Sequence, residues 1–112
     1  MIITPSPGIA GHRITRTFGL VRGNTIRARH LGRDITAVFR NLVGGEIREY
    51  TKLMAEAREQ SIDRMIEAAR DLGANAIVNV RFTTSYIMGS ASEILVFGDA
   101  VVAESESGGE AP

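Results

Sequence analysis

Residues 46–73 read EIREYTKLMAEAREQSIDRMIEAARDLG, and this stretch decides how the chain folds. Apolar and small side chains recur in it every three or four residues, which is the period of an amphipathic α-helix. The stripe consists of Ile47, Tyr50, Met54, Ala57, Ser61, Met65, Ala68 and Leu72, widened by Leu53, Ile62, Ile66 and Ala69. The opposite side is charged, and Gly73 is a residue of the kind that ends helices. The pattern predicts one long helix over residues 46–72 with one buried face.

A β-hairpin is predicted directly after this helix, with strands over residues 75–87 and 92–103 joined at Gly89-Ser90. The first strand alternates apolar with polar residues, so one of its faces should be wet. The second strand is apolar on both sides, so both of its faces should be covered. Two helices can hardly cover both faces of every strand, and we therefore expect another subunit to cover one of them.

A second hairpin is predicted near the start of the chain, where alternating segments flank Arg22-Gly23-Asn24-Thr25. Gly23-Asn24 supplies the positive φ angle that a two-residue turn needs. A short amphipathic helix should follow from Asp34 and stop at Gly44-Gly45. Its apolar positions are spaced like one helix face, and they are Ile35, Val38, Phe39 and Leu42.

The chain has 112 residues and a mass of 12.1 kDa, and two independent cores rarely fit into fewer than about 150 residues. We therefore expect a single domain over residues 1–103 and a disordered acidic tail over residues 104–112. The fold class is α+β, in the order β-hairpin, short helix, long helix, β-hairpin. A chain of this size buries about two-thirds of its surface, so oligomerisation would help to stabilise it.

Composition excludes several function classes. The absence of cysteine rules out disulfides, thiolate metal sites and cysteine nucleophiles. The longest uninterrupted apolar runs, 94–97 and 100–103, are far too short to span a membrane, and the first residues do not resemble a signal peptide. These features predict a cytoplasmic protein without a membrane partner. We find no catalytic constellation, so we expect no enzyme, with an enzyme of unknown reaction as an alternative.

The formal net charge of zero conceals an asymmetry along the chain. Residues 10–40 carry seven Arg and one Asp, whereas residues 72–112 carry one Arg and five acidic residues. Segments of opposite sign tend to be neighbours within a sheet or across a subunit boundary. The basic first hairpin also leaves a nucleic-acid-binding protein open as an alternative function. We regard that partner as disfavoured, because only Phe18 is interleaved among its arginines as a stacking platform.

Several short motifs of this chain resemble the YbjQ-like family of small uncharacterised proteins. They are Gly19-Leu20-Val21-Arg22-Gly23, Gly32-Arg33-Asp34, Arg40, Val43-Gly44-Gly45, Tyr50, Ala57-Arg58 and residues 72–78. The resemblance implies a dodecin-like α+β subunit whose antiparallel strands wrap around the long helix. It also implies a ring-shaped homopentamer, and the family is catalogued as a heavy-metal-binding domain.

Binding of a metal ion is therefore implied by the resemblance alone, and the residues themselves indicate no cofactor. Heavy metals favour sulfur ligands, and this chain offers only the thioethers of Met1, Met54, Met65 and Met88. Of these, Met54 and Met65 lie on the buried helix stripe. The nitrogen donors His12 and His30 fall roughly 16 Å apart on the predicted strands, so one chain cannot chelate with both. A ring could still gather copies of one histidine around its axis.

Five residues at positions that match the family motifs form a candidate ligand-binding set, namely Arg33, Asp34, Arg40, Tyr50 and Arg58. Arginines clustered near one carboxylate could bind an anion, or they could join helices or subunits by ion pairs. Asp99 is a further candidate, because it stands in an otherwise apolar strand and needs a partner there. We expect an arginine from another segment or subunit. The resulting hypothesis is a ring-forming homo-oligomer that binds a metal or small ligand at its subunit boundaries.

Overall fold

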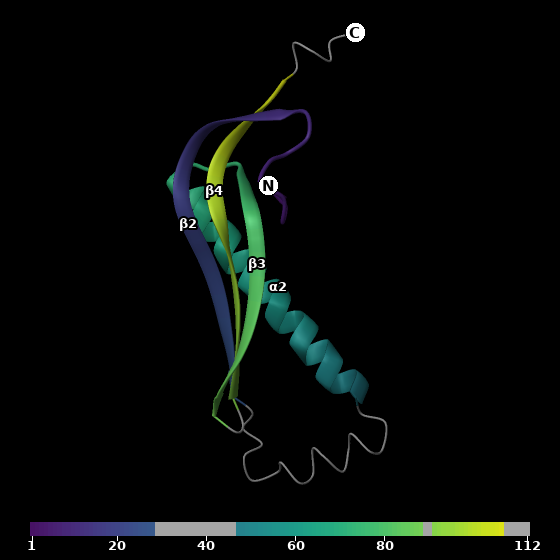
Figure 1. Ribbon diagram of the computed structural model, residues 1–112. Coiled ribbons are helices and arrows are strands. Elements are labelled where there is room, and N and C mark those ends of the chain that lie inside the picture. The colour runs from purple at the N-terminus through teal and green to yellow at the C-terminus, as the bar shows by residue number, and fades with distance from the viewer. Residues whose placement is uncertain (29–46, 89–90, 107–112) are drawn as a thin grey trace.

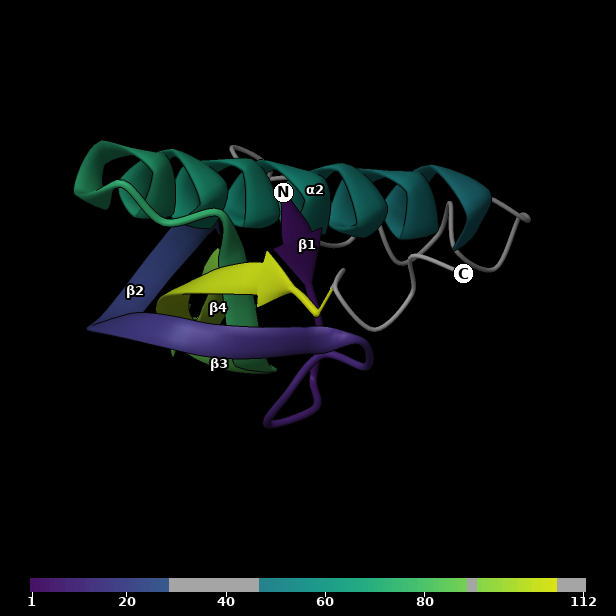
Figure 2. The same ribbon diagram turned by 90° about the horizontal axis from the view of Figure 1, so that it is seen from above.

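The computed structural model describes residues 1–28, 47–88 and 91–106 (Figure 1). The elements are β1 (Ile2–Ile3), β2 (His12–Ala28), α2 (Ile47–Leu72), β3 (Ala76–Met88) and β4 (Ala91–Ser105). The four strands form one sheet in the order β1-β3-β4-β2, in which only β1 runs parallel to its neighbour. Helix α2 packs against one face of this mixed sheet (Figure 2), which confirms the α+β class. The expected short helix and residue His30 lie outside the described residues.

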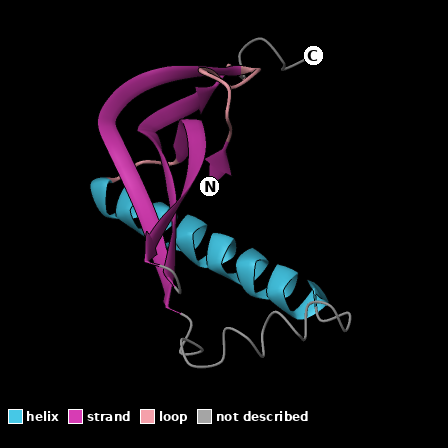
Figure 3. Ribbon diagram, turned by 60° about the horizontal axis from the view of Figure 1, so that its bottom comes forward, coloured by secondary structure: helices cyan, strands magenta, loops and turns pink. Residues whose placement is uncertain are grey.

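The long helix is confirmed, and it ends as the sequence predicts. Gly73 has a φ angle of +94°, its N–H donates to the Arg70 carbonyl, and the Ala74 N–H donates to the Ala69 carbonyl. This pair of hydrogen bonds is a Schellman motif, which satisfies carbonyl groups of the last helical turn. The helix crosses the strands obliquely, so its C-terminal half lies against the sheet and its N-terminal half extends beyond it (Figure 3).

The expected first hairpin is wrong. β2 is one continuous strand of 17 residues that pairs antiparallel with β4 from His12–Ser105 to Ala28–Ala91. Gly23 serves a different purpose from a turn, because a Cβ atom there would overlap the Ser61 carbonyl oxygen and lie 2.5 Å from Met65 N. The glycine therefore lets α2 approach the sheet closely.

β3 and β4 pair antiparallel where the second hairpin was predicted, and the predicted turn residues 89 and 90 lie outside the described part of the chain. Their register contains a bulge between Val78 and Arg81, where Asn79 has a φ angle of +55°. Asn is one of the few residues that adopt this left-handed conformation readily. Together with a second register shift, between Tyr86 and Met88, this bulge places Asp99 opposite Val78 and not opposite Val80 as an unbroken register would.

Apolar residues are buried on both faces of the sheet. On the helix face they are Val21, Met65, Ala69, Ala74, Ile77, Val80, Val96 and Ala100. On the other face, Ala76, Val78, Val101 and Ala103 are buried under Ile9 of the N-terminal segment. At the end of β4 near Val101 the chain thus covers this face with its own N-terminal segment.

The N-terminal segment reaches this position through backbone hydrogen bonds along the free edge of β3. Beyond β1, the Thr4 N–H donates to the Ile77 carbonyl and the Val80 N–H donates to the Thr4 carbonyl. The expected boundary between domain and tail also moves, because β4 continues to Ser105 and the Glu106 N–H donates to the Gly11 carbonyl. Residues 107–112 lie outside the described residues. No helix in the described ranges is long and apolar enough to cross a membrane.

Candidate functional site

Only two of the five candidate ligand-binding residues lie in the described part of the chain. Arg33, Asp34 and Arg40 are outside it, whereas Tyr50 and Arg58 are both in α2. The two positions are eight residues apart along the helix, which amounts to a rise of about 12 Å and a net turn of about 80°. They therefore share the N-terminal half of α2 but are not adjacent on one face.

Arg58 is exposed, whereas Ala57 and Ser61 beside it on α2 are fully buried. A guanidinium group in this position is solvated and offers several N–H donors in a planar fork. The position suits binding of an anion or a contact with another protein surface.

His12 and Met65 are poorly placed to act as heavy-metal ligands within this subunit. Nδ1 of His12 lies 3.0 Å from the Ala10 carbonyl oxygen, so Nδ1–H can donate there and only Nε2 remains for a ligand. Met65 is fully buried in the core between α2 and the sheet. Within ranges 1–28, 47–88 and 91–106 no three His, Cys, Asp or Glu residues cluster as metal ligands.

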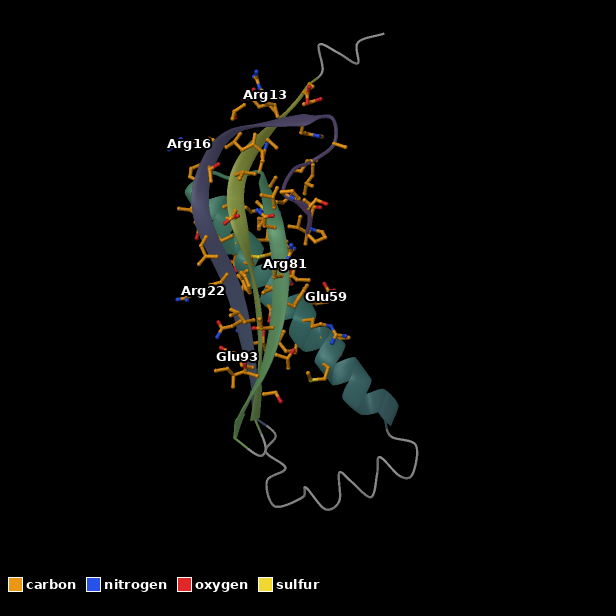
Figure 4. All side chains as sticks on the ribbon, viewed as in Figure 1. Arg13, Arg16, Arg22, Glu59, Arg81 and Glu93 are labelled. Atoms are coloured by element: carbon orange, nitrogen blue, oxygen red, sulfur yellow. The ribbon has the colours of Figure 1, made fainter. Side chains whose placement is uncertain are left out.

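Three exposed arginines, Arg13, Arg16 and Arg22, project from β2 and are directed away from the sheet (Figure 4). The single aromatic residue among them is already engaged, since the Arg16 guanidinium lies 4.6 Å from the centre of the Phe18 ring. That geometry is a cation–π contact. Phe18 is also half-buried against the core, so its ring is not a free platform on which a nucleic-acid base could stack.

Asp99 has a neutral partner, and the expected arginine is absent among the described residues. Nδ2 of Asn79 donates to Oδ2 of Asp99 at 3.0 Å, and Asp99 is half-buried. Asn79 reaches the carboxylate because the bulge turns its backbone into the left-handed region. Asp99 does have a hydrogen-bonding partner, as predicted. The bulge that brings Asn79 to it could not be predicted from the alternation of apolar and polar residues in the strand.

Asn79 therefore has two separable roles, which two substitutions can distinguish. Asn79→Gly keeps the left-handed backbone and loses the hydrogen bond to Asp99, and we expect a loss of about 1–2 kcal/mol in the free energy of unfolding. Asn79→Ala should cost more, because alanine also disfavours a positive φ angle. Urea denaturation measures both, and equal losses for the two variants would contradict the backbone role.

A polar seam that the sequence did not reveal joins α2 to the sheet. The Ser61 hydroxyl is fully buried and lies 2.9 Å from Thr25 Oγ1, 3.0 Å from the Ala57 carbonyl oxygen and 3.2 Å from the Ile94 carbonyl oxygen. A hydroxyl has one proton and two lone pairs, so Ser61 can donate to a carbonyl and accept from Thr25. The small stripe residues Ala57 and Ser61 are the sequence signal for such a close helix approach.

The same seam continues to the surface on the outer side of β2. Nη1 of Arg64 donates to the Asn24 carbonyl oxygen at 2.6 Å, and Nδ2 of Asn24 donates to Oε2 of Glu93 at 3.1 Å. β2 is an edge strand, and edge strands carry backbone groups that could pair with another strand. Arg64 occupies one such carbonyl group, so the edge is closed to strand pairing at Asn24.

Large apolar side chains remain exposed on both sides of the sheet. On β2, Leu20 is 66% and Ile26 is 55% exposed, and on β3 Phe82 is 47% exposed. Phe82 lies opposite the buried Val96 and thus on the helix face, but α2 does not cover it. An apolar surface exposed in this way on a small protein is typical of a contact with another protein.

Comparisons with known proteins give a consistent result. The family model YbjQ_1, whose description is "Putative heavy-metal-binding", matches residues 1–104. A UPF0145 protein of Dehalococcoides mccartyi is 53% identical over 104 residues, covering 93% of this chain and all of that protein. A UPF0145 protein of Halorubrum lacusprofundi is 56% identical over 101 residues, covering 90% of this chain and 97% of the other. These names assign no activity.

One solved structure supports the fold. It is the crystal structure of a protein with unknown function from the DUF74 family of Pediococcus pentosaceus. The two structures agree with a TM-score of 0.56 over 93% of this chain and 98% of the other. The sequences are 14% identical, so the likeness concerns the fold alone.

Proposed function

The chain belongs to the YbjQ_1 family, and on that premise we propose that it is the subunit of a ring-shaped homopentamer that binds a small anionic ligand at its subunit boundaries. The observation that carries the proposal is the long edge strand β2, whose side chains Leu20 and Ile26 are exposed. A neighbouring subunit on this edge would remove both from water.

The exposed apolar side chains support assembly. Leu20 is 66%, Ile26 is 55% and Phe82 is 47% exposed. Burial of such side chains between copies would stabilise an assembly.

The ligand follows from an exposed cation in the N-terminal half of α2, the guanidinium group of Arg58. A guanidinium group binds carboxylate and phosphate groups, whereas a soft metal ion prefers sulfur and nitrogen donors. The described residues hold no cluster of three His, Cys, Asp or Glu side chains, so we propose an anion as the ligand.

Two measurements test this function. Size-exclusion chromatography with light scattering should give one species of about five times the chain mass, and a monomer at all concentrations would contradict the assembly. Native mass spectrometry of the complex purified from its host should show a bound anion that is lost on Arg58→Ala. A bound metal ion retained by that variant would refute the anionic ligand and favour the family description instead.

A further inference from the structure

We infer that the side of the sheet formed by Leu20, Arg22 and Ile26 packs against Phe82 and Glu59 of the next copy of this chain. The first surface is called the β2 flank and the second, which combines β3 with the adjoining side of α2, is called the β3 flank. The inference rests on the proposed assembly and names the surfaces that form it.

The two flanks lie on opposite sides of the subunit. β2 is one edge strand, and β3 is the strand nearest the other edge, where the short β1 covers only its beginning. Each flank exposes large apolar side chains, Leu20 and Ile26 on one and Phe82 on the other. Two different surfaces on opposite sides make a head-to-tail contact, which closes into a ring when the rotation fits.

The two flanks also offer one pair of opposite charges, Arg22 and Glu59. β2 contains arginines and no acidic residue. The exposed residues of α2 are of both signs, with Glu56, Glu59, Asp63 and Glu67 beside Arg58, Arg64 and Arg70. Among the described residues neither Arg22 nor Glu59 forms an ion pair with another side chain. Each charge is therefore available to a neighbouring copy, where partial burial would strengthen the attraction.

The positions of Arg22 and Glu59 fit a rotation about an axis that runs along the strands. Figure 4 shows the two residues at nearly the same level along the strands and on opposite sides of the subunit. A rotation about such an axis moves a residue around the ring without changing its level. Arg22 of one copy is thereby brought toward Glu59 of the next.

The contact is made by side chains and not by strand pairing across the centre of β2. Arg64 already occupies the Asn24 carbonyl group, next to the exposed residues of the flank. Continuous addition of a strand along β2 would have to break this 2.6 Å hydrogen bond. Leu20, Arg22 and Ile26 alternate along the strand and share the face that a neighbouring side-chain surface would cover.

Charge reversal tests the pair. Arg22→Glu and Glu59→Arg should each raise the subunit concentration of half-dissociation at least tenfold, because each places like charges opposite one another. The double variant should restore assembly to near the native level. Glu67→Arg makes the same charge change elsewhere on the exposed side of α2 and serves as the matched control. Light scattering over a dilution series measures assembly, and circular dichroism checks folding.

Cysteine crosslinking gives an independent readout, because the native chain contains no cysteine. A variant with Arg22→Cys and Glu59→Cys should form disulfides between copies under mild oxidation, visible as a ladder of linked chains on a non-reducing gel. The control that pairs Arg22→Cys with Glu67→Cys should not. If the native chain is oligomeric but neither the rescue nor the ladder is seen, this contact is wrong and the proposed assembly stands. If the native chain is monomeric, the proposed assembly itself fails.

Discussion

Gly23→Ala is expected to lower the melting temperature by roughly 10 °C, which corresponds to about 3 kcal/mol for a chain of this size. A methyl group at this position would overlap the Ser61 carbonyl oxygen and crowd the Met65 backbone nitrogen at 2.5 Å. Both are backbone atoms of α2, so no side-chain rotation relieves the overlap. The helix would have to move away from β2 and open the buried seam around Ser61.

Gly8→Ala is the matched control for this substitution. A Cβ atom at Gly8 has no neighbour within 4 Å, and its φ angle is not in the left-handed region. Thermal unfolding followed by circular dichroism should show no loss for Gly8→Ala. If Gly23→Ala had the same melting temperature as the native chain, α2 would not approach β2 as closely as the structure shows.

Met65→Ala is expected to cost about 2–5 kcal/mol in the free energy of unfolding. The side chain is fully buried where α2 meets the sheet, among Val21, Ile77 and Val96. Removing it deletes apolar contacts and leaves a cavity, because the backbone around it is fixed by the close helix approach. Urea denaturation measures the loss as a lower midpoint at an unchanged slope.

Met65→Leu nearly preserves the volume and should cost less than about 1.5 kcal/mol. The difference between the two variants isolates the packing contribution of the side chain. If Met65→Ala were as stable as the native chain, Met65 would not lie in the core, and its thioether could again be considered as a metal ligand.

The elements with strong periodicity were predictable from the sequence. The stripe of α2 and the cap at Gly73 fix the long helix, and the alternation on both sides of residues 89–90 indicates the β3–β4 hairpin. The sequence around Gly23 led to the wrong prediction, because a glycine next to an asparagine is also typical of a turn. Only the position of α2 against Gly23 shows that the glycine serves close helix packing. The two-residue strand β1 is too short to leave any period at all.

The candidate site was less predictable, because its interactions join residues from distant parts of the chain. Arg58 was found through a family motif, and the structure adds that its side chain is exposed. The Asn79–Asp99 pair depends on a bulge, and the seam of Ser61, Thr25 and Arg64 depends on how α2 crosses β2. Neither the bulge position nor the crossing is encoded in the local pattern of either partner.

The place of β4 in the middle of the sheet affects how the protein is made. β4 is the last strand of the chain, yet both β2 and β3 pair with it. During synthesis on a ribosome, β2 cannot pair with β4 until β4 has emerged, whereas α2 can form earlier because its hydrogen bonds are local. Such long-range pairings slow folding and leave strands exposed to aggregation meanwhile. The arginines of β2 would then keep nascent chains apart by charge repulsion during this interval.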